Sequence, residues 1–187
     1  MHYWHIQMNK PYGRKDDNEI DPLLMLNNQP PIIGLGEWDD TQCSDFKNRC
    51  KVGEIVLVRK GKTPIALCEI KGECFQNSKL TNKFLHFNFR EVEVLGLWDS
   101  NETCSLSQGT FKILYEENSQ SWYFVDNWYK RLQGVKVIQD AIDLLEANKN
   151  LILTGAPGTG KTYLAKQIAA KITCFNGNNL DNNEQCE

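Results

Sequence analysis

The stretch Gly155-Ala156-Pro157-Gly158-Thr159-Gly160-Lys161-Thr162 is the most informative part of this chain. Its pattern, G-x-x-x-x-G-K-[ST], is that of a loop that wraps phosphate groups. Glycines let successive backbone N–H groups turn towards phosphate oxygens, and the helix that follows adds the positive end of its dipole. In this pattern the lysine reaches the β- and γ-phosphates and the hydroxyl of Thr162 ligates Mg²⁺. The sequence therefore predicts a nucleotide-phosphate site here.

The residues around this loop predict a strand before it and helices on both sides. Residues 150–154 are mostly apolar and predict a short buried strand, and residues 163–171 predict the helix that follows the loop. Residues 135–148 predict an amphipathic helix, because apolar side chains recur there at helical spacing. We therefore expect a partial α/β phosphate-loop unit at residues 133–175, with the boundary near Gly134. Its nucleotide-binding residues are predicted to be Gly155, Pro157, Gly158, Thr159, Gly160, Lys161 and Thr162.

The first part of the chain, residues 1–132, predicts many short strands. Apolar and β-branched runs alternate with short polar or glycine-containing stretches, which is the pattern of a small curled sheet or barrel. The clearest pair lies around the turn Lys60-Gly61-Lys62-Thr63, which predicts a hairpin. The expected strands are residues 3–8, 32–36, 54–59, 64–71, 84–89, 91–97, 110–115 and 122–124. Short helices are expected at residues 22–27, 41–50 and 126–131. The last segment, residues 176–187, is rich in asparagine and is expected to be disordered.

Composition narrows the class of protein. The chain has 21 basic and 24 acidic residues and a net charge of −3, so no global basic field draws it to nucleic acid. Its 7 cysteines include no C-x-x-C pair, which argues against a zinc site or a disulfide framework and favours reduced thiols. The N-terminus lacks the pattern of a signal peptide, and no apolar run has the length of a membrane span. A cytoplasmic location is expected.

Basic side chains are concentrated in one segment, residues 47–62. A solvated surface is the ordinary interpretation of such a segment. A nucleic-acid-binding face is the alternative, because lysine and arginine neutralise backbone phosphates. On that alternative the phosphate contacts come from Lys47, Arg49, Lys51, Arg59, Lys60 and Lys62.

Trp38 differs from the other aromatic residues in its surroundings. It lies in the stretch Gly34-Leu35-Gly36-Glu37-Trp38-Asp39-Asp40, between glycines and acids. Aromatic residues in small β-domains usually belong to the core, but this composition is typical of a loop, where exposed aromatic residues tend to be functional. A tryptophan face there can stack a planar base. The candidates for a base pocket are Trp38, Phe84, Phe75 and Trp4, and a core position for Trp4 is an equally good interpretation.

Four stretches of the first part resemble an EVE-type domain of the PUA-like superfamily. They are Tyr3-Trp4-His5-Ile6-Gln7-Met8, Ile33-Gly34-Leu35-Gly36-Glu37-Trp38-Asp39, Val52-Gly53-Glu54-Ile55-Val56-Leu57-Val58 and Pro64-Ile65-Ala66-Leu67-Cys68-Glu69-Ile70. The resemblance implies an α+β fold, a PUA-like (EVE/YTH-type) curled β-barrel with short helices. EVE and YTH domains are readers of modified bases and enclose a flipped base in an aromatic cage. One cage tryptophan lies just before the first helix, and Trp38 is the matching position.

The stretch Asp126-Asn127-Trp128-Tyr129-Lys130 resembles the variant of this domain that is fused to McrB-like NTPases. Those proteins are AAA+ motor subunits of modification-dependent restriction systems, and they usually hydrolyse GTP. The resemblance implies that the first part binds DNA with a modified base, methylation being the expected modification. It also implies Mg²⁺ with GTP or ATP as cofactors of the full-length protein, a full-length homo-oligomeric ring and a separate McrC-like nuclease subunit. No cofactor is expected for the N-terminal domain.

The chain departs from that family in its NTPase part. The acidic Walker B motif, the sensor residues and the arginine finger have no counterpart here, so we expect a truncated product without hydrolytic activity of its own. Two alternatives stay open. One is a phosphate-loop NTPase fragment whose first part mediates protein contacts, and the other is a YTH-like reader of modified RNA. A pocket-lining Trp38 beside basic residues favours a reader, whereas a core position for Trp38 weakens that interpretation.

Overall fold

The computed structural model describes residues 1–8, 20–37, 40–100, 103, 105, 108–115 and 119–177. The chain divides into two compact units, Met1–Tyr129 and Lys130–Glu187, and each unit is described by itself. The three-part division expected from the sequence stays a prediction, and its last segment lies almost wholly outside the described residues.

The first unit combines short helices with strands. Its strands are β1 (Tyr3–Gln7), β2 (Ile32–Leu35), β3 (Ile55–Lys60), β4 (Thr63–Ile70), β5 (Asn88–Leu97) and β6 (Phe111–Leu114). Its short helices are α1 (Pro22–Leu26), α2 (Thr41–Ser44), the π-helical turn η1 (Asp45–Arg49) and α3 (Ser78–Phe84). The helix α4 (Gln120–Asn148) begins in this unit and continues into the second.

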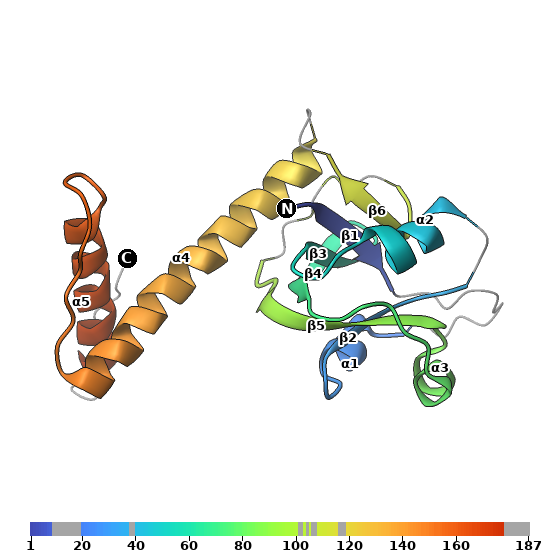
Figure 1. The fold of residues 1–187 in the computed structure, drawn as a ribbon, viewed down its shortest axis with the longest axis horizontal. Helices are drawn as coiled ribbons and strands as arrows, with labels where there is room; N and C mark the ends of the chain where they lie inside the picture. The colour runs from blue at the N-terminus through green and yellow to red at the C-terminus, as the bar shows by residue number, and fades with distance from the viewer. Residues whose placement is uncertain are drawn as a thin grey trace. The chain divides into compact units, whose positions relative to one another are not determined.

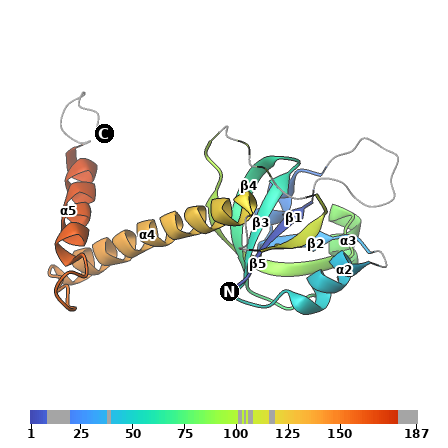
Figure 2. The ribbon, with the colours of Figure 1, turned by 90° about the horizontal axis from the view of Figure 1, so that it is seen from above.

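These strands form one curled, mixed sheet of 6 strands in the order β2-β5-β4-β3-β1-β6. β1 pairs with β3 in parallel, and the other neighbours are antiparallel. The curl is visible in Figure 1 and, from above, in Figure 2. In Figure 1, α1 lies beside β2, whereas α2 and η1 contact β6. The α+β class and the curled sheet expected from the sequence are confirmed.

The central strands are buried on both faces, which explains their continuous apolar runs. Trp4 of β1 faces the main core, where its ring stacks on Phe111 of β6 at 4.9 Å between centroids. Tyr3, the neighbouring residue, faces α4 and donates a hydrogen bond of 2.9 Å from its hydroxyl to Asp126. Alternation along β1 therefore joins the sheet core to the first turns of α4.

The β3–β4 hairpin is confirmed. β3 ends at Lys60 and β4 begins at Thr63. Gly61 has a φ of 59°, a left-handed conformation that side chains rarely adopt. The expected helix at residues 22–27 is also confirmed as α1, where Asp21 caps the first turn and Pro22 follows at the position that tolerates proline.

Two expected strands are wrong. Residues 84–87 do not belong to a strand, because α3 ends at Phe84 and Leu85 takes a left-handed conformation, and residues 88–89 form the start of β5 instead of a separate strand. Asn77 starts that helix, since its side chain accepts hydrogen bonds from the N–H groups of Lys79 and Leu80. Residues 122–124 lie in α4 instead of a strand, and the hydroxyl of Ser119 accepts from the N–H of Trp122 at the start of that helix.

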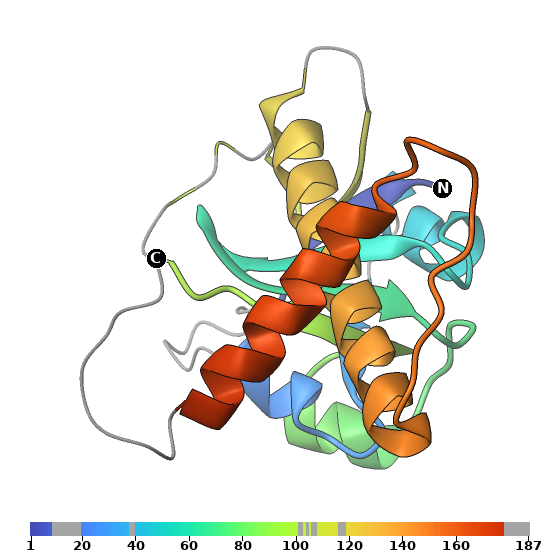
Figure 3. The ribbon, with the colours of Figure 1, turned by 90° about the vertical axis from the view of Figure 1, so that its left-hand side faces the viewer.

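The second unit packs α5 (Lys161–Gly177) against the last turns of α4, as Figure 3 shows. Ala141 and Ile142 from α4 and Ile168 from α5 form its small core, which agrees with the apolar periodicity of the sequence. The strand expected at residues 150–154 is wrong, since these residues have no regular structure. A strand needs a neighbouring strand for its backbone groups, and the described part of this unit provides none.

None of the helices in the described residues is long and apolar enough to cross a membrane.

Candidate functional site

A cluster of polar side chains in the first unit includes Glu37, the residue that precedes Trp38 in the sequence. It is built around Glu37, which follows the end of β2. Lys47 of η1 forms an ion pair with Glu37 Oε1, and Asn88 of β5 donates a hydrogen bond of 2.8 Å to Glu37 Oε2. Gln76, from the segment between β4 and α3, donates to Asn88 Oδ1 at 3.1 Å and lies 3.5 Å from Glu37 Oε2. We call Glu37, Lys47, Gln76 and Asn88 the Glu37 cluster.

The electrostatics of the cluster keep Glu37 ionised. The hydrogen bonds from Lys47 and then from Asn88 lower the pKa of the Glu37 carboxyl below its usual range. The same contact raises the pKa of Lys47. Both side chains keep contact with solvent, with 43% of the Glu37 side chain and 31% of the Lys47 side chain exposed. The cluster therefore presents a carboxylate and an ammonium group at the surface.

The backbone on both sides of Trp38 and Asp39 is held in place. Gly36 O accepts a hydrogen bond of 3.1 Å from Asn88 Nδ2. Asp40 caps α2, because its side chain accepts from the N–H of Cys43 at 3.0 Å. Trp38 itself, the main predicted wall of the base pocket, lies outside the described residues, so its role stays a prediction.

Two of the other aromatic candidates belong to the core instead of a pocket. Trp4 is fully buried, and its indole N–H donates to Glu54 Oε2 at 2.7 Å. Phe84 is also buried, at the end of α3. These two assignments from the sequence are corrected, because a side chain enclosed on all sides by the core has no face left for a base. Phe75 is only partly buried and adjoins Gln76 of the Glu37 cluster, so it stays a candidate.

Arg59 was predicted to contact phosphate, and the structure contradicts this prediction. Only 5% of this residue is exposed. Its guanidinium donates from Nε to His5 Nδ1 at 3.1 Å and from Nη2 to Gly109 O at 2.7 Å. The donors of Arg59 are thus committed inside the fold, and the residue stabilises the β3–β4 turn and the chain before β6.

The other predicted phosphate contacts have different surroundings. Lys47 is paired with Glu37. Arg49 lies 3.7 Å from Asp45 Oδ2 and approaches the Trp4 ring at 5.8 Å. Lys51, Lys60 and Lys62 are exposed, the last two at the β3–β4 turn. A phosphate role for these residues stays a prediction.

Sequence reasoning missed Glu37, Gln76 and Asn88. Asn88 had a detectable signal, since it is a polar residue within the apolar run Phe87-Asn88-Phe89. Glu37 directly precedes Trp38, but an acid beside an aromatic residue is common on surfaces. Gln76 had no signal of its own, because only the fold brings it to Asn88.

The phosphate loop in the second unit has the backbone that its glycines predict. Gly155, Gly158 and Gly160 have φ values of 145°, 79° and 76°, which residues with side chains rarely adopt. Lys161 folds onto its own loop, with Nζ donating to Gly155 O at 2.9 Å and to Ala156 O at 2.6 Å. Thr162 is exposed at the first turn of α5.

These groups fit a nucleotide phosphate with its Mg²⁺. The loop combines a lysine ammonium, a helix N-terminus and an exposed threonine hydroxyl, which are the donor types that such a group requires. Lys161 would hold the phosphate oxygens and Thr162 the metal. The nucleotide and Mg²⁺ stay predictions.

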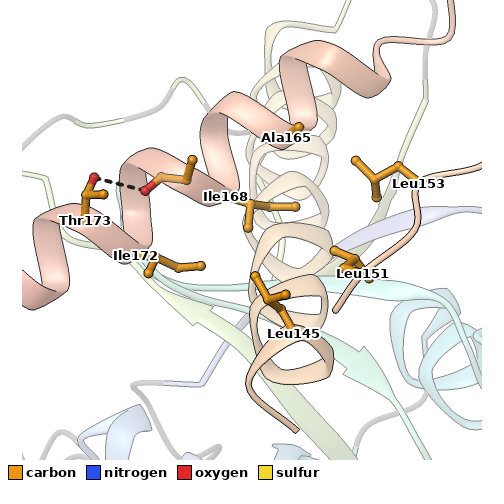
Figure 4. Close-up of a pocket in the computed structure, with 8 residues that line it drawn as sticks. Leu145, Leu151, Leu153, Ala165, Ile168, Ile172 and Thr173 are labelled. Atoms are coloured by element: carbon orange, nitrogen blue, oxygen red, sulfur yellow. Dashed lines mark hydrogen bonds between the residues drawn. The ribbon is translucent and has the colours of Figure 1, made fainter. Parts of the chain in front are cut away.

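An apolar groove of about 400 Å³ lies between α5, the last turns of α4 and the segment that follows α4. Figure 4 shows Leu145 of α4, Leu151 and Leu153 of the connecting segment, and the α5 side chains that line it. Thr173 turns its hydroxyl onto Ala169 O at 3.0 Å, so that its methyl group adds to the apolar lining. The groove contains no group suited to chemistry.

Comparison with known proteins gives partial matches. A family described as Novel STAND NTPase 3 matches residues 134–182. The chain is 24% identical over 187 residues to the Pachytene checkpoint protein 2 homolog of Xenopus tropicalis, which covers 90% of this chain and 40% of that protein. It is 24% identical over 180 residues to the homolog of Gallus gallus, covering 89% of this chain and 40% of that protein. The chain therefore spans about 40% of the length of these curated relatives.

Among solved structures, the chain is similar to human THYN1 protein in complex with DNA that contains 5-methylcytosine. The TM-score is 0.37 and the sequence identity 13%, over 52% of this chain and 67% of that one. This similarity is of low degree.

Proposed function

We propose that the first unit is a DNA-binding specificity module that recognises a modified base, and that the second unit contributes a nucleotide-binding loop. In this proposal the chain acts in a modification-dependent restriction system of the McrB-like type, with a PUA-like reader and an AAA+ motor. Mg²⁺ with GTP or ATP, a ring of full-length copies and a separate nuclease subunit are its further elements.

The observation that carries the proposal is the Glu37 cluster, which is built around the residue that precedes Trp38 in the sequence. Side chains from β5, from η1 and from the segment between β4 and α3 converge on Glu37, the residue that directly precedes the tryptophan in the sequence. Recognition of an unstacked base requires hydrogen-bonding groups together with an aromatic face, and in this proposal Trp38 supplies that face.

The first test removes the aromatic face. Trp38→Ala is expected to weaken binding to DNA with a modified base about tenfold or more, because base–aromatic stacking contributes roughly 1–3 kcal/mol. Fluorescence anisotropy with labelled oligonucleotides measures the affinity, and circular dichroism checks that the variant is folded.

Tyr123→Ala is the matched control, since it removes another exposed aromatic residue from the same unit. It is expected to leave affinity unchanged. Unaltered binding in a folded Trp38→Ala variant would refute the base-pocket role. Parallel titrations with RNA of the same sequence separate the DNA reader from the RNA reader, because only RNA offers a 2′-hydroxyl.

The second test concerns the phosphate loop. Lys161→Ala is expected to reduce the affinity for GTP or ATP with Mg²⁺ at least tenfold, because it removes the cation that faces the phosphates. Isothermal titration calorimetry on the 187-residue chain measures this. Lys166→Ala, an exposed lysine of the same helix, is the control and should bind like the wild type. Equal nucleotide affinity in the Lys161 and Lys166 variants would contradict the assignment.

A further inference from the structure

We infer that the segment after α4, Leu151-Ile152-Leu153-Thr154, pairs as an antiparallel strand with the same segment of a second copy of this chain. The inference goes beyond the proposed function and is independent of the base site. Its basis is a stretch of backbone that has no partner among the described residues, together with the apolar groove on which that stretch lies.

The backbone of residues 151–154 is unpaired. These residues have no regular structure, and their N–H and C=O groups make no backbone hydrogen bond to any described residue. Figure 1 shows the segment running alongside α5 without a helical turn. A helix has already used its own backbone groups, so among protein elements an extended segment is the one that can pair with this row of donors and acceptors.

The side chains of the segment alternate as they do in a strand. Leu151 and Leu153 are partly buried and line the groove, whereas Ile152 between them is 81% exposed. Figure 4 shows the two leucines on one side of the groove and Ile168 and Ile172 of α5 on the other. A period of two with one face on a layer of helices is the arrangement of an edge strand, and an apolar edge strand is a template for pairing.

The groove suits the side chains of a second strand. About 400 Å³ of space remains in it, and its lining is almost wholly apolar. On the α5 side two of the lining residues, Ala165 and Ala169, are small, so they leave room for bulkier side chains. Leucine side chains from a strand laid beside the segment would remove this apolar surface from water.

A second copy of the segment meets both requirements, because antiparallel pairing about a two-fold axis is self-complementary. In the register centred on Ile152, that residue faces its own copy, and Leu151 faces Leu153 of the second copy. Residues directly opposite each other lie on the same face of a sheet. All four leucines therefore lie on the helix side, and the two isoleucines meet on the other side.

The experiment measures the association of the 187-residue chain by sedimentation equilibrium, from micromolar to near-millimolar protein. The average mass is expected to rise above the 21.5 kDa of one chain towards twice that value. Over the same range, hydrogen exchange should show the amides of residues 151–154 becoming more protected, because pairing places alternate N–H groups in a strand ladder.

Opposite charges at the two-fold axis give the specific test. Because Ile152 is exposed in the single chain, Ile152→Lys and Ile152→Glu are expected to leave it folded, which circular dichroism checks. Each variant alone is expected to associate about tenfold more weakly than the wild type, since like charges directly opposite each other destabilise a strand pair. An equimolar mixture of the two variants is expected to recover association to within severalfold of the wild type, because lysine then faces glutamate.

Leu144→Lys is the matched control, since it places the same charge at another exposed apolar residue of the second unit, and it should associate like the wild type. A wild-type chain that stays monomeric over the whole range would overturn the inference. So would an Ile152→Lys variant that associates like the wild type, or a mixture that associates no better than either variant alone. None of these results bears on binding to modified DNA, so the proposed function is tested separately.

Discussion

The pair of His5 and Arg59 shows how one buried contact sets a protonation state. Arg59 Nε donates to His5 Nδ1 at 3.1 Å. A guanidinium has no acceptor and stays protonated, so the imidazole must accept and must be neutral. Burial and then the charges of Arg59 and Lys112 lower the pKa of His5 to about 3. The histidine was part of the first expected strand, but nothing in its sequence neighbours indicated an arginine partner.

This pair predicts a loss of stability in acid. In the unfolded chain the pKa of a histidine is about 6.5. Between that value and a folded pKa of about 3, the unfolded state binds a proton that the folded state does not. The contribution of His5 to stability is therefore complete above pH 6.5 and is lost as the pH falls towards 3. One proton gives a slope of about 1.4 kcal/mol per pH unit.

His5→Gln keeps an acceptor for Arg59 but cannot titrate, so it is expected to flatten the dependence of unfolding free energy on pH. Urea denaturation between pH 4 and pH 7 measures both slopes. His86, whose pKa burial also lowers, contributes equally to both proteins and cancels in the difference. Identical slopes in the variant and the wild type would show that His5 already titrates normally in the fold.

Two glycines, one inside a helix and one in a turn, differ in their backbone conformation. Gly134 lies in the middle of α4, and a Cβ built there would meet no atom within 4 Å. Gly53 precedes β3 and also has open space around it, but its φ is 86°. The two positions thus offer the same room and differ in backbone conformation alone.

Alanine is expected to act in opposite directions at these two positions. Gly134→Ala should stabilise α4 by up to about 1 kcal/mol, because glycine is a poor helix former. Gly53→Ala should destabilise the first unit by about 1–2 kcal/mol, because a side chain disfavours the left-handed conformation. Denaturation followed by circular dichroism measures both. A stabilising Gly53→Ala, or a destabilising Gly134→Ala, would contradict the backbone conformations described above.

The chain as a whole is acidic, so any affinity for DNA must come from a local surface. The net charge is −3. With Arg59 inside the fold and Lys47 paired with Glu37, the exposed basic residues of the predicted segment are Arg49, Lys51, Lys60 and Lys62. The basic surface is therefore smaller than the sequence suggests.

Salt dependence tests this surface. Replacing Lys51, Lys60 and Lys62 by alanine is expected to weaken the binding of modified and of unmodified duplex DNA to the same extent. It should also flatten the plot of log affinity against log salt by about 0.9 for each phosphate contact that is lost. Replacing Lys136, Lys149 and Lys166 of the second unit is the charge-matched control, with an unchanged slope expected. If the first triple variant lost only its preference for the modified base, these lysines would belong to base recognition instead.

The sequence by itself determined those parts of the protein whose backbone conformation depends only on residues nearby in the chain. Glycine spacing predicted the phosphate loop, and its left-handed glycines follow from the absence of a Cβ. Alternation and the turn at Gly61 predicted the β3–β4 hairpin. Helical periodicity predicted the helix at residues 135–148, whose apolar side chains pack against α5 in the structure. The expected strand at residues 150–154 was wrong because a strand depends on a partner that local sequence does not specify.

Only the tertiary structure decided which polar and aromatic residues are buried and which meet at the surface. Trp4 donates a hydrogen bond to Glu54, and Arg59 donates one to Gly109, each across about 50 residues of chain. These buried contacts exclude Trp4 from the base pocket and Arg59 from the phosphate contacts. Asn88 joins Glu37 and Gln76 in the same way, from three places that the sheet brings together. Residue type and spacing indicate the local conformation of the chain. Which side chains are buried, and which meet at the surface, depends on the long-range pairing of strands, and that pairing cannot be inferred from the local pattern of a single sequence.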